Sequence, residues 1–305
     1  MNWSRPSLAA AHRHRNGFLY GLAAYGLWGG MPVYFKLLAD ISAVDIVAHR
    51  VLWSLPFLAV LLAFTRGWEK VRAVLASRRT LAILVLTALL IGTNWLLYVY
   101  SVVGGHILAA SFGYYLNPLA NVLLGRFVLK ERLSRLQWIA VGIAAAGISV
   151  LAAGAVGQLW ISLTLCVSFA LYGLLRKIVD ADAMTGLAVE TGLLFPFAAG
   201  WLLARYIGGT AIFGHGQVDA AMLVAAGVVS STPLLLFTAA ARRLDYSTLG
   251  MLQFLAPTLQ FLLAVFLYGE HFTIAHAIAF AAIWTALGLY VMALVRAPRL
   301  PTPPE

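Results

Sequence analysis

The chain has few charged residues and a single cysteine. Only 10% of its 305 residues are Asp, Glu, Lys or Arg, whereas 62% are hydrophobic. With a mean hydropathy of +0.89, the chain lacks the polar residues that would cover a soluble globule of this length. Cys166 stands alone within an apolar segment, which excludes a disulfide framework and a cysteine metal site. We therefore predict an integral membrane protein.

Acidic residues are scarcer than basic ones, 11 against 21, which leaves a net charge of +10 at pH 7. A nucleic-acid-binding protein needs its Lys and Arg clustered on one folded face. Here the basic residues occur in short runs between apolar segments, the distribution that sets membrane topology. The charge thus indicates orientation in a bilayer, and we expect no nucleic-acid partner.

Motifs for chemistry are also missing. The sequence has no phosphate-binding loop, no H-E-x-x-H or G-x-S-x-G motif, and no paired acids inside the apolar segments. The histidine spacings match no metal site. These absences argue against direct use of ATP and against a membrane-embedded enzyme, and we expect no cofactor and no metal.

What the sequence does contain is an internal repeat. The run Ser111–Glu131, SFGYYLNPLANVLLGRFVLKE, returns 139 residues later as Gly250–Glu270, GMLQFLAPTLQFLLAVFLYGE. Each copy is apolar and has one proline near its middle, Pro118 or Pro257, where a helix loses a backbone hydrogen bond and bends or breaks. Paired interruptions at corresponding places in two halves point to a transporter's binding site.

Ten apolar segments are long enough to cross a bilayer as helices. They cover residues 17–38, 44–65, 80–102, 106–126, 135–153, 158–176, 185–205, 219–240, 246–268 and 273–295. We predict an all-α integral membrane protein with ten transmembrane helices. Residues 17–153 form a first five-helix repeat and residues 158–295 a second, between a basic cytoplasmic tail at 1–16 and a disordered cytoplasmic tail at 296–305.

Eighteen of the 21 basic residues fall on one side of this arrangement. Basic residues of short loops stay preferentially in the cytoplasm, so both termini are predicted to be cytoplasmic. Five spans per repeat is an odd number, which requires the second repeat to enter the membrane upside down. The loop charges agree, because Lys130 and Arg132 of the first copy correspond to Gly269 and His271 of the second. The sequence therefore predicts an inverted-topology repeat.

Two stretches give the chain a family resemblance. Tyr25–Lys36, YGLWGGMPVYFK, and Ala48–Phe57, AHRVLWSLPF, are similar to the RarD group of the drug/metabolite transporter superfamily, whose members carry two inverted five-helix EamA-type domains. The resemblance extends over nearly the whole chain. It implies a multi-pass permease of the bacterial inner membrane, from a group often labelled by chloramphenicol resistance or sensitivity. It brings neither a physiological substrate nor binding residues.

A charge inside a span costs about 2.5–3.5 kcal/mol at the bilayer centre and needs an explanation. The candidates are Lys36, Arg50 and Glu190. Lys36 and Arg50 lie toward the outer ends of the first two spans. Either they snorkel to the surface and pair with Asp40 or Asp45, or they line an outward cavity as anion contacts or gate charges. Glu190 is the only acid deep in a span, and its alternatives are a proton-coupling carboxylate, a cation contact and a structural hydrogen bond. We assign all three residues to gating or coupling.

Polar and aromatic residues gather near the predicted midplane. Many share a helix face by spacing, and each one alone is as well explained by hydrogen bonds between helices. As a set beside Pro118 and Pro257, they form the predicted substrate site, with Trp28 and Tyr172 as candidates for its wall. The predicted substrate contacts are Asn94, Tyr98, Tyr114, Asn117, Asn121, Gln253 and Gln260.

These observations predict a secondary transporter whose inverted halves rock about the midplane site. Aromatic and amide side chains with few charges suit small amphipathic or aromatic metabolites and drugs, such as chloramphenicol-like compounds, and we expect export. Proton exchange and facilitated diffusion are both open as the driving mechanism. The alternatives are a membrane-embedded enzyme and a non-transporting sensor or scaffold, which lacks the soluble output domain that such a role usually needs.

Overall fold

The computed structural model of the chain describes residues 8–38, 40–103, 107–152, 159–211, 213, 217–267 and 274–296. Within these ranges the backbone forms helices joined by turns, without a β-strand. The prediction of an all-α protein is therefore confirmed for the described part of the chain.

The helices follow the predicted spans closely. The first half contains α1 (Leu8–Lys36), α2 (Ala43–Phe64), α4 (Arg78–Val103), α5 (Ile107–Phe127) and α6 (Arg135–Ala152). The second half contains α7 (Leu159–Ile178), α8 (Ala183–Ile207), α9 (Gln217–Ala241), α10 (Tyr246–Gln253), α11 (Leu255–Leu262), the π-helix η2 (Leu263–Leu267) and α12 (Ile274–Arg296). A short helix, α3 (Trp68–Ala76), has no counterpart among the predicted spans and lies in the basic segment after the second of them.

Several helices have the length and composition of membrane spans. Five described helices qualify over Ala43–Phe64, Arg78–Ser101, Trp160–Ile178, Ala183–Ile207 and Ala220–Ala241, and shorter apolar helices cover Arg135–Val150 and Ala277–Ala293. Large apolar side chains also lie on the outside, with exposed fractions of 82% for Phe266 and 77% for Phe197. Because such side chains face lipid in a bilayer but are costly in water, the described chain has the surface of a multi-pass membrane protein.

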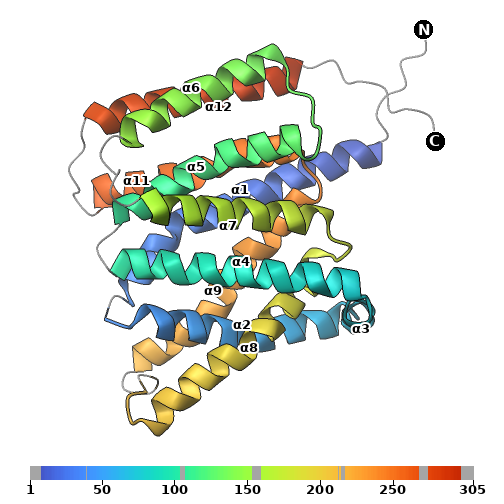
Figure 1. The fold of residues 1–305 in the computed structure, drawn as a ribbon, viewed down its shortest axis with the longest axis vertical. Helices are drawn as coiled ribbons and strands as arrows, with labels where there is room; N and C mark the ends of the chain where they lie inside the picture. Colours follow the sequence, from blue (N-terminus) through green and yellow to red (C-terminus); the bar gives the residue numbers. More distant parts are fainter. Residues whose placement is uncertain are drawn as a thin grey trace.

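The long helices lie side by side in an elongated array (Figure 1). Helix α6 packs against α12 at one end of the array, and α2 packs against α8 at the other. Between these pairs the two halves exchange partners: α1 packs on α9 and α11, whereas α7 packs on α4 and α5. The two halves of the chain therefore share one core and do not form separate bodies.

The repeat seen in the sequence also appears in the helix boundaries. Helix α9 begins 139 residues after α4, and α12 begins 139 residues after α6. This is the offset that relates Ser111–Glu131 to Gly250–Glu270. Corresponding segments of the two copies thus begin their helices at the same place.

The two repeat prolines behave differently. Pro257 has no N–H to donate to the carbonyl of Gln253, and the helix is interrupted at this point: α10 ends at Gln253 and α11 begins at Leu255. In contrast, α5 runs through Pro118 without interruption. The predicted break at Pro118 is therefore wrong, because a membrane helix tolerates the loss of the single hydrogen bond to Tyr114 when it is packed against neighbours.

Side-chain caps fix the starts of several helices. The side chain of Ser42 accepts a hydrogen bond from the Asp45 N–H at the start of α2, and Asp182 accepts one from the Thr185 N–H at the start of α8. Glu131, from the segment after α5, accepts hydrogen bonds from the N–H groups of Tyr246 and Ser247 at 2.6 and 3.0 Å. A carboxylate of the first half thereby satisfies the N-terminus of α10 in the second half.

Candidate functional site

A cavity opens where the exchanged helices of the two halves meet. It holds about 660 Å³ of empty space, part of it continuous with the outside. Side chains of α1, α2, α4, α5, α7, α10 and α11 line it. Its polar wall contains Arg50, Asn94, Tyr98, Tyr114, Gln253 and Gln260. Five of these are predicted substrate contacts, and Arg50 was predicted to act in gating or coupling, so the fold brings most of the predicted substrate contacts to one place.

On the α4 side, the polar wall is held by contacts between three helices. The Asn94 amide donates to the Leu165 carbonyl and to the Ser168 hydroxyl of α7, both at 3.0 Å. The Tyr114 hydroxyl of α5 donates to the Asn94 side-chain oxygen at 3.4 Å. The rings of Tyr98 and Tyr114 meet edge to face, with centroids 5.3 Å apart. Asn94 therefore both lines the cavity and joins α4 to α7.

On the opposite side, two glutamines come from the interrupted span. The Gln253 side-chain oxygen accepts a hydrogen bond from the Asn121 amide at 2.8 Å. The Gln260 amide donates to the Trp28 carbonyl of α1 at 3.0 Å. Asn121 is fully buried behind Gln253 and does not line the cavity. The interruption beside Pro257, which does line the cavity, presents both glutamines to it.

Asn117 differs from the other predicted contacts. It is fully buried in α5 and is not part of this cavity's lining. Both atoms of its amide group lack a hydrogen-bond partner among the described residues. Five of the seven predicted substrate contacts thus reach the cavity, Asn121 supports one of them, and Asn117 lies elsewhere in α5.

The apolar wall is mainly aromatic, and the sequence indicated only part of it. Trp28 lies 5.6 Å from Phe169 and 5.7 Å from Tyr25, measured between ring centroids. Together with Met31 and Phe35, these residues line the cavity. The spacing of positions 25, 28, 31 and 35 places them along one face of a helix, a signal that could have identified this wall in advance. Tyr172, also considered for the wall, packs against Phe169 behind it.

Arg50 brings a positive charge to the cavity. The residue is 4% exposed, and its guanidinium carbon lies 4.5 Å from the ring centroid of Trp95 and 5.7 Å from that of Phe35. Asp45, one of its predicted partners, instead forms an ion pair with Arg205 at 3.2 Å. Among the described residues, Arg50 has cation–π contacts and no ion pair with a carboxylate.

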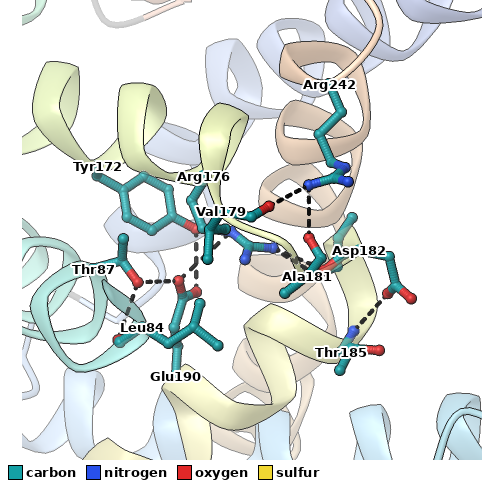
Figure 2. A network of polar contacts seen from close by, with 11 residues as sticks. Leu84, Thr87, Tyr172, Arg176, Val179, Ala181, Asp182, Thr185, Glu190 and Arg242 are labelled. Carbon is teal, nitrogen blue, oxygen red and sulfur yellow. Dashed lines mark hydrogen bonds and ion pairs between the residues drawn. The ribbon is translucent and has the colours of Figure 1, made fainter. Parts of the chain in front are cut away.

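Glu190 lies outside the cavity, within a separate polar network (Figure 2). Its carboxylate lies 3.6 Å from the Nε atom of Arg176 and accepts hydrogen bonds from the Thr87 hydroxyl at 2.5 Å and the Tyr172 hydroxyl at 3.4 Å. The side chains of Glu190 and Arg176 are 1% and 0% exposed. The network therefore joins α4, α7 and α8 through a fully buried ion pair.

The position of Arg176 corrects one sequence interpretation. Arg176 is one of the eighteen basic residues that the sequence assigned to the cytoplasmic side as topology-setting charges. Its side chain is nevertheless buried and donates to the carbonyls of Asp182 and Ala183 at 3.2 and 3.1 Å. Arg242 closes the same turn by donating to the carbonyls of Val179 and Ala181 (Figure 2). These arginines satisfy backbone groups in the turn between α7 and α8.

Two remaining predictions concern Lys36 and metals. Lys36 is the last residue of α1 and does not line the cavity. In the part of the chain that the structure describes, no group of three or more His, Cys, Asp or Glu residues is arranged to hold a metal ion.

The chain is similar in sequence to known transporters over most of its length. A family model described as the EamA-like transporter family matches residues 15–153. The chain is 43% identical over 290 residues to "Protein RarD" of Escherichia coli, covering 92% of this chain and 96% of that protein. It is 47% identical over 297 residues to an "Uncharacterized transporter" of Pseudomonas aeruginosa, covering 95% and 98%.

A more distant relative carries a phenotype in its name. "Chloramphenicol-sensitive protein RarD" of Pseudomonas aeruginosa is 34% identical over 277 residues, covering 89% of this chain and 92% of that protein. A solved crystal structure shares the fold with a TM-score of 0.69 at 19% identity, covering 93% of this chain and all of that chain. These similarities point to a transporter and away from an enzyme.

Proposed function

This chain belongs to the RarD group of the EamA-like transporters, and we propose that it moves small amphipathic or aromatic solutes across the bacterial inner membrane as a secondary transporter. The observation that carries this proposal is the cavity between the two halves. Its walls combine aromatic rings with amide and hydroxyl groups, the composition of sites for small organic solutes.

The transport mechanism in this proposal is alternating access. Asn94, Tyr98 and Tyr114 come from the first half of the chain, whereas Gln253 and Gln260 come from the second. Movement of one half against the other would open and close the site by breaking and remaking the contacts that join the halves there, such as those of Asn94 with α7 and of Gln253 with Asn121. Of the seven predicted substrate residues, the proposal assigns direct contact to the five that line the cavity and the positioning of Gln253 to Asn121. Asn117 is proposed only as a further polar residue of α5.

The two halves are proposed to be inverted five-helix repeats over 17–153 and 158–295, with ten spans and both termini in the cytoplasm. The exchanged packing of α1 and α7 supports this arrangement, since related units that share a two-fold axis make equivalent contacts with each other. The family match over residues 15–153 also supports it, because that range nearly coincides with the first proposed repeat.

Direction and coupling complete the proposal. We propose export, with chloramphenicol-like compounds among the candidate solutes, as the name of one relative suggests. Lys36, Arg50 and Glu190 are proposed to act in gating or coupling, with protons as the candidate coupling ion. Pro257 is proposed to provide flexibility within the interrupted span beside the site.

Solute counterflow in proteoliposomes tests this function. Purified protein would be screened with aromatic metabolites, amino acids and chloramphenicol, alongside Tyr98→Ala in the cavity wall and Tyr206→Ala, which changes a side chain that is 74% exposed at the end of α8. We expect exchange of at least one solute, a loss of about tenfold or more in Tyr98→Ala and no loss in Tyr206→Ala. A wild-type protein that exchanges nothing in a broad screen would contradict the proposal.

A further inference from the structure

The charge of Arg50 is not balanced by the residues around it. Among the residues whose side chains the structure describes, two acids are buried, and both are engaged elsewhere. Asp45 pairs with Arg205 and accepts a hydrogen bond from the Trp201 indole at 2.9 Å, while Glu190 pairs with Arg176. A buried guanidinium without a carboxylate is costly, so a protein that retains one has a use for its charge.

The contacts of Arg50 hold its side chain in place but leave donors unused. Trp95 and Phe35 present ring faces to the guanidinium, which favours the cation without accepting its N–H bonds. The Nε atom of Arg50 has no hydrogen-bond partner among the described residues, although it is fully buried. An arginine side chain carries five N–H donors in a planar fork that matches a carboxylate. The cavity therefore presents a preorganised receptor for an anionic group.

The rest of the cavity indicates what that anionic group is attached to. Trp28 lies two helical turns before Phe35 on α1, about 10 Å along the helix. At the Trp28 level the wall is formed by Tyr25, Trp28 and Phe169, which suits an aromatic ring. The side chain of Gln253 accepts from Asn121 through its oxygen, which leaves its amide N–H groups as the end that can donate to a solute.

We propose that the transported solute is an aromatic organic acid whose single carboxylate binds Arg50 while its ring packs against Trp28 and Phe169. This inference rests on the proposed transport function and narrows its substrate class. It also assigns Arg50 to substrate recognition and not to gating alone. An uncharged compound of the same shape would make the same aromatic contacts but would leave the Arg50 guanidinium unpaired.

A matched pair of probes tests this inference at pH 7. 3-Phenylpropanoate and 3-phenylpropanamide have nearly the same shape but differ in charge. Binding is measured by thermal stabilisation of the purified protein, and transport by counterflow. We expect the acid to bind about tenfold to a hundredfold more tightly than the amide, the difference expected for a hydrogen-bonded charge.

Variants assign the preference to one residue. Arg50→Gln should abolish the difference between acid and amide, and Arg50→Lys should keep part of it, because an ammonium retains the charge without the planar fork. Arg79→Gln, which removes an exposed arginine from α4, should keep the full preference. If Arg50→Gln does not fold, the acid and amide affinities of the wild-type protein still decide the matter.

The outcomes separate this inference from the proposed function. Equal binding of acid and amide to the wild-type protein overturns the inference while leaving a solute transporter. Binding of chloramphenicol with no binding of the acid has the same meaning. If none of the three compounds binds and a broad screen finds no exchange, the proposed function fails together with the inference.

Discussion

Arg176 and Glu190 form the ion pair in which both partners are buried, unlike the other two ion pairs of the described residues. Both side chains are almost completely excluded from the surface. Removing either charge leaves the other buried and unpaired, which costs about 3–5 kcal/mol in comparable sites. We therefore expect Arg176→Gln and Glu190→Gln each to lower the free energy of unfolding by roughly this amount, measured by denaturant unfolding in detergent micelles.

The double variant separates an ionic role from a packing role. Arg176→Gln with Glu190→Gln leaves no buried charge at this pair, so the stability of the double variant should lie above that of either single variant.

We also propose above that Glu190 couples transport to protons. A Glu190→Gln protein that keeps wild-type stability but loses the pH dependence of transport would favour coupling over the structural role.

The pKa of Asp182 predicts how the stability of the protein depends on pH. Partial burial raises the pKa of its carboxyl, but hydrogen bonds from Thr185 and the charge of Lys70, 3.2 Å away, outweigh burial and lower the pKa below its ordinary value. A lowered pKa in the folded state means that the ionised carboxylate stabilises the fold. This contribution is present above the unfolded pKa of about 3.9 and is lost as the pH falls through the folded pKa.

Asp182→Ala should therefore destabilise the protein by about 1 kcal/mol at pH 7, the usual value of a helix cap. The difference from wild type should shrink as the pH falls below the ordinary carboxyl pKa. Thermal unfolding at several pH values measures it, and Asp180→Ala, which changes an exposed acid two residues earlier, is the control. An equal loss of stability at all pH values would show that the carboxylate charge has no part in the cap.

The sequence identified some of the buried charges but not all of them. Arg50 and Glu190 were recognised because a charge inside an apolar run is costly wherever the chain goes. Arg176 was not, because it lies at the end of an apolar run, where a charge normally meets water. Its burial depends on how α7 turns into α8, and the hydropathy pattern does not encode that geometry.

Whole helices were predicted more reliably than the contacts between them. The long helices of the described chain lie within a few residues of the predicted spans, because the length of an apolar run determines where a chain can cross a bilayer. The exception is α1, which begins at Leu8, nine residues before its predicted span and within the predicted tail. Helix α3 was missed because it is short and contains charged residues. The intact α5 was missed because a proline's effect depends on the packing around it.

The approach of α5 to α7 depends on one glycine. A Cβ atom at Gly113 would lie 2.7 Å from the backbone carbonyl oxygen of Ser162 and 3.0 Å from its Cα. Since α5 and α7 form one of the exchanged contacts, Gly113→Ala should push them apart and lower the free energy of unfolding by about 1–3 kcal/mol. Thermal unfolding of the purified variant measures this effect.

Gly142 in α6 provides the matched control. A Cβ atom there would meet no other atom within 4 Å. Gly142→Ala should therefore leave stability unchanged or raise it by up to about 1 kcal/mol, because alanine favours a helix over glycine. Equal losses in both variants would mean that the space around Gly113 does not decide how closely α5 and α7 pack.

At the scale of the whole molecule, the cavity arises from the exchange of helices between the two halves. Helix α1 supplies most of its apolar wall and packs on α9 and α11, while α7 packs on α4 and α5. The sequence repeat predicted which residues correspond in the two halves. It did not predict that the first helix of each half packs on the other half, because periodicity within one unit carries no information about contacts between units. Aromatic residues of α1 were therefore largely absent from the predicted site.

The proposed topology can be tested through α8. This helix begins beside α3 (Figure 1), where Lys70 forms an ion pair with Asp182. Its 25 residues extend about 37 Å, more than the hydrocarbon core of a bilayer. Cys166 is buried, so the wild-type protein serves as the unlabelled control. In intact spheroplasts, a membrane-impermeant maleimide should label Ile207→Cys at the far end of α8 and should label Ala73→Cys in α3 only after lysis. Labelling of Ala73→Cys in intact spheroplasts, with Ile207→Cys protected until lysis, would invert the proposed orientation, and labelling of both from one side would show that α8 does not cross the membrane.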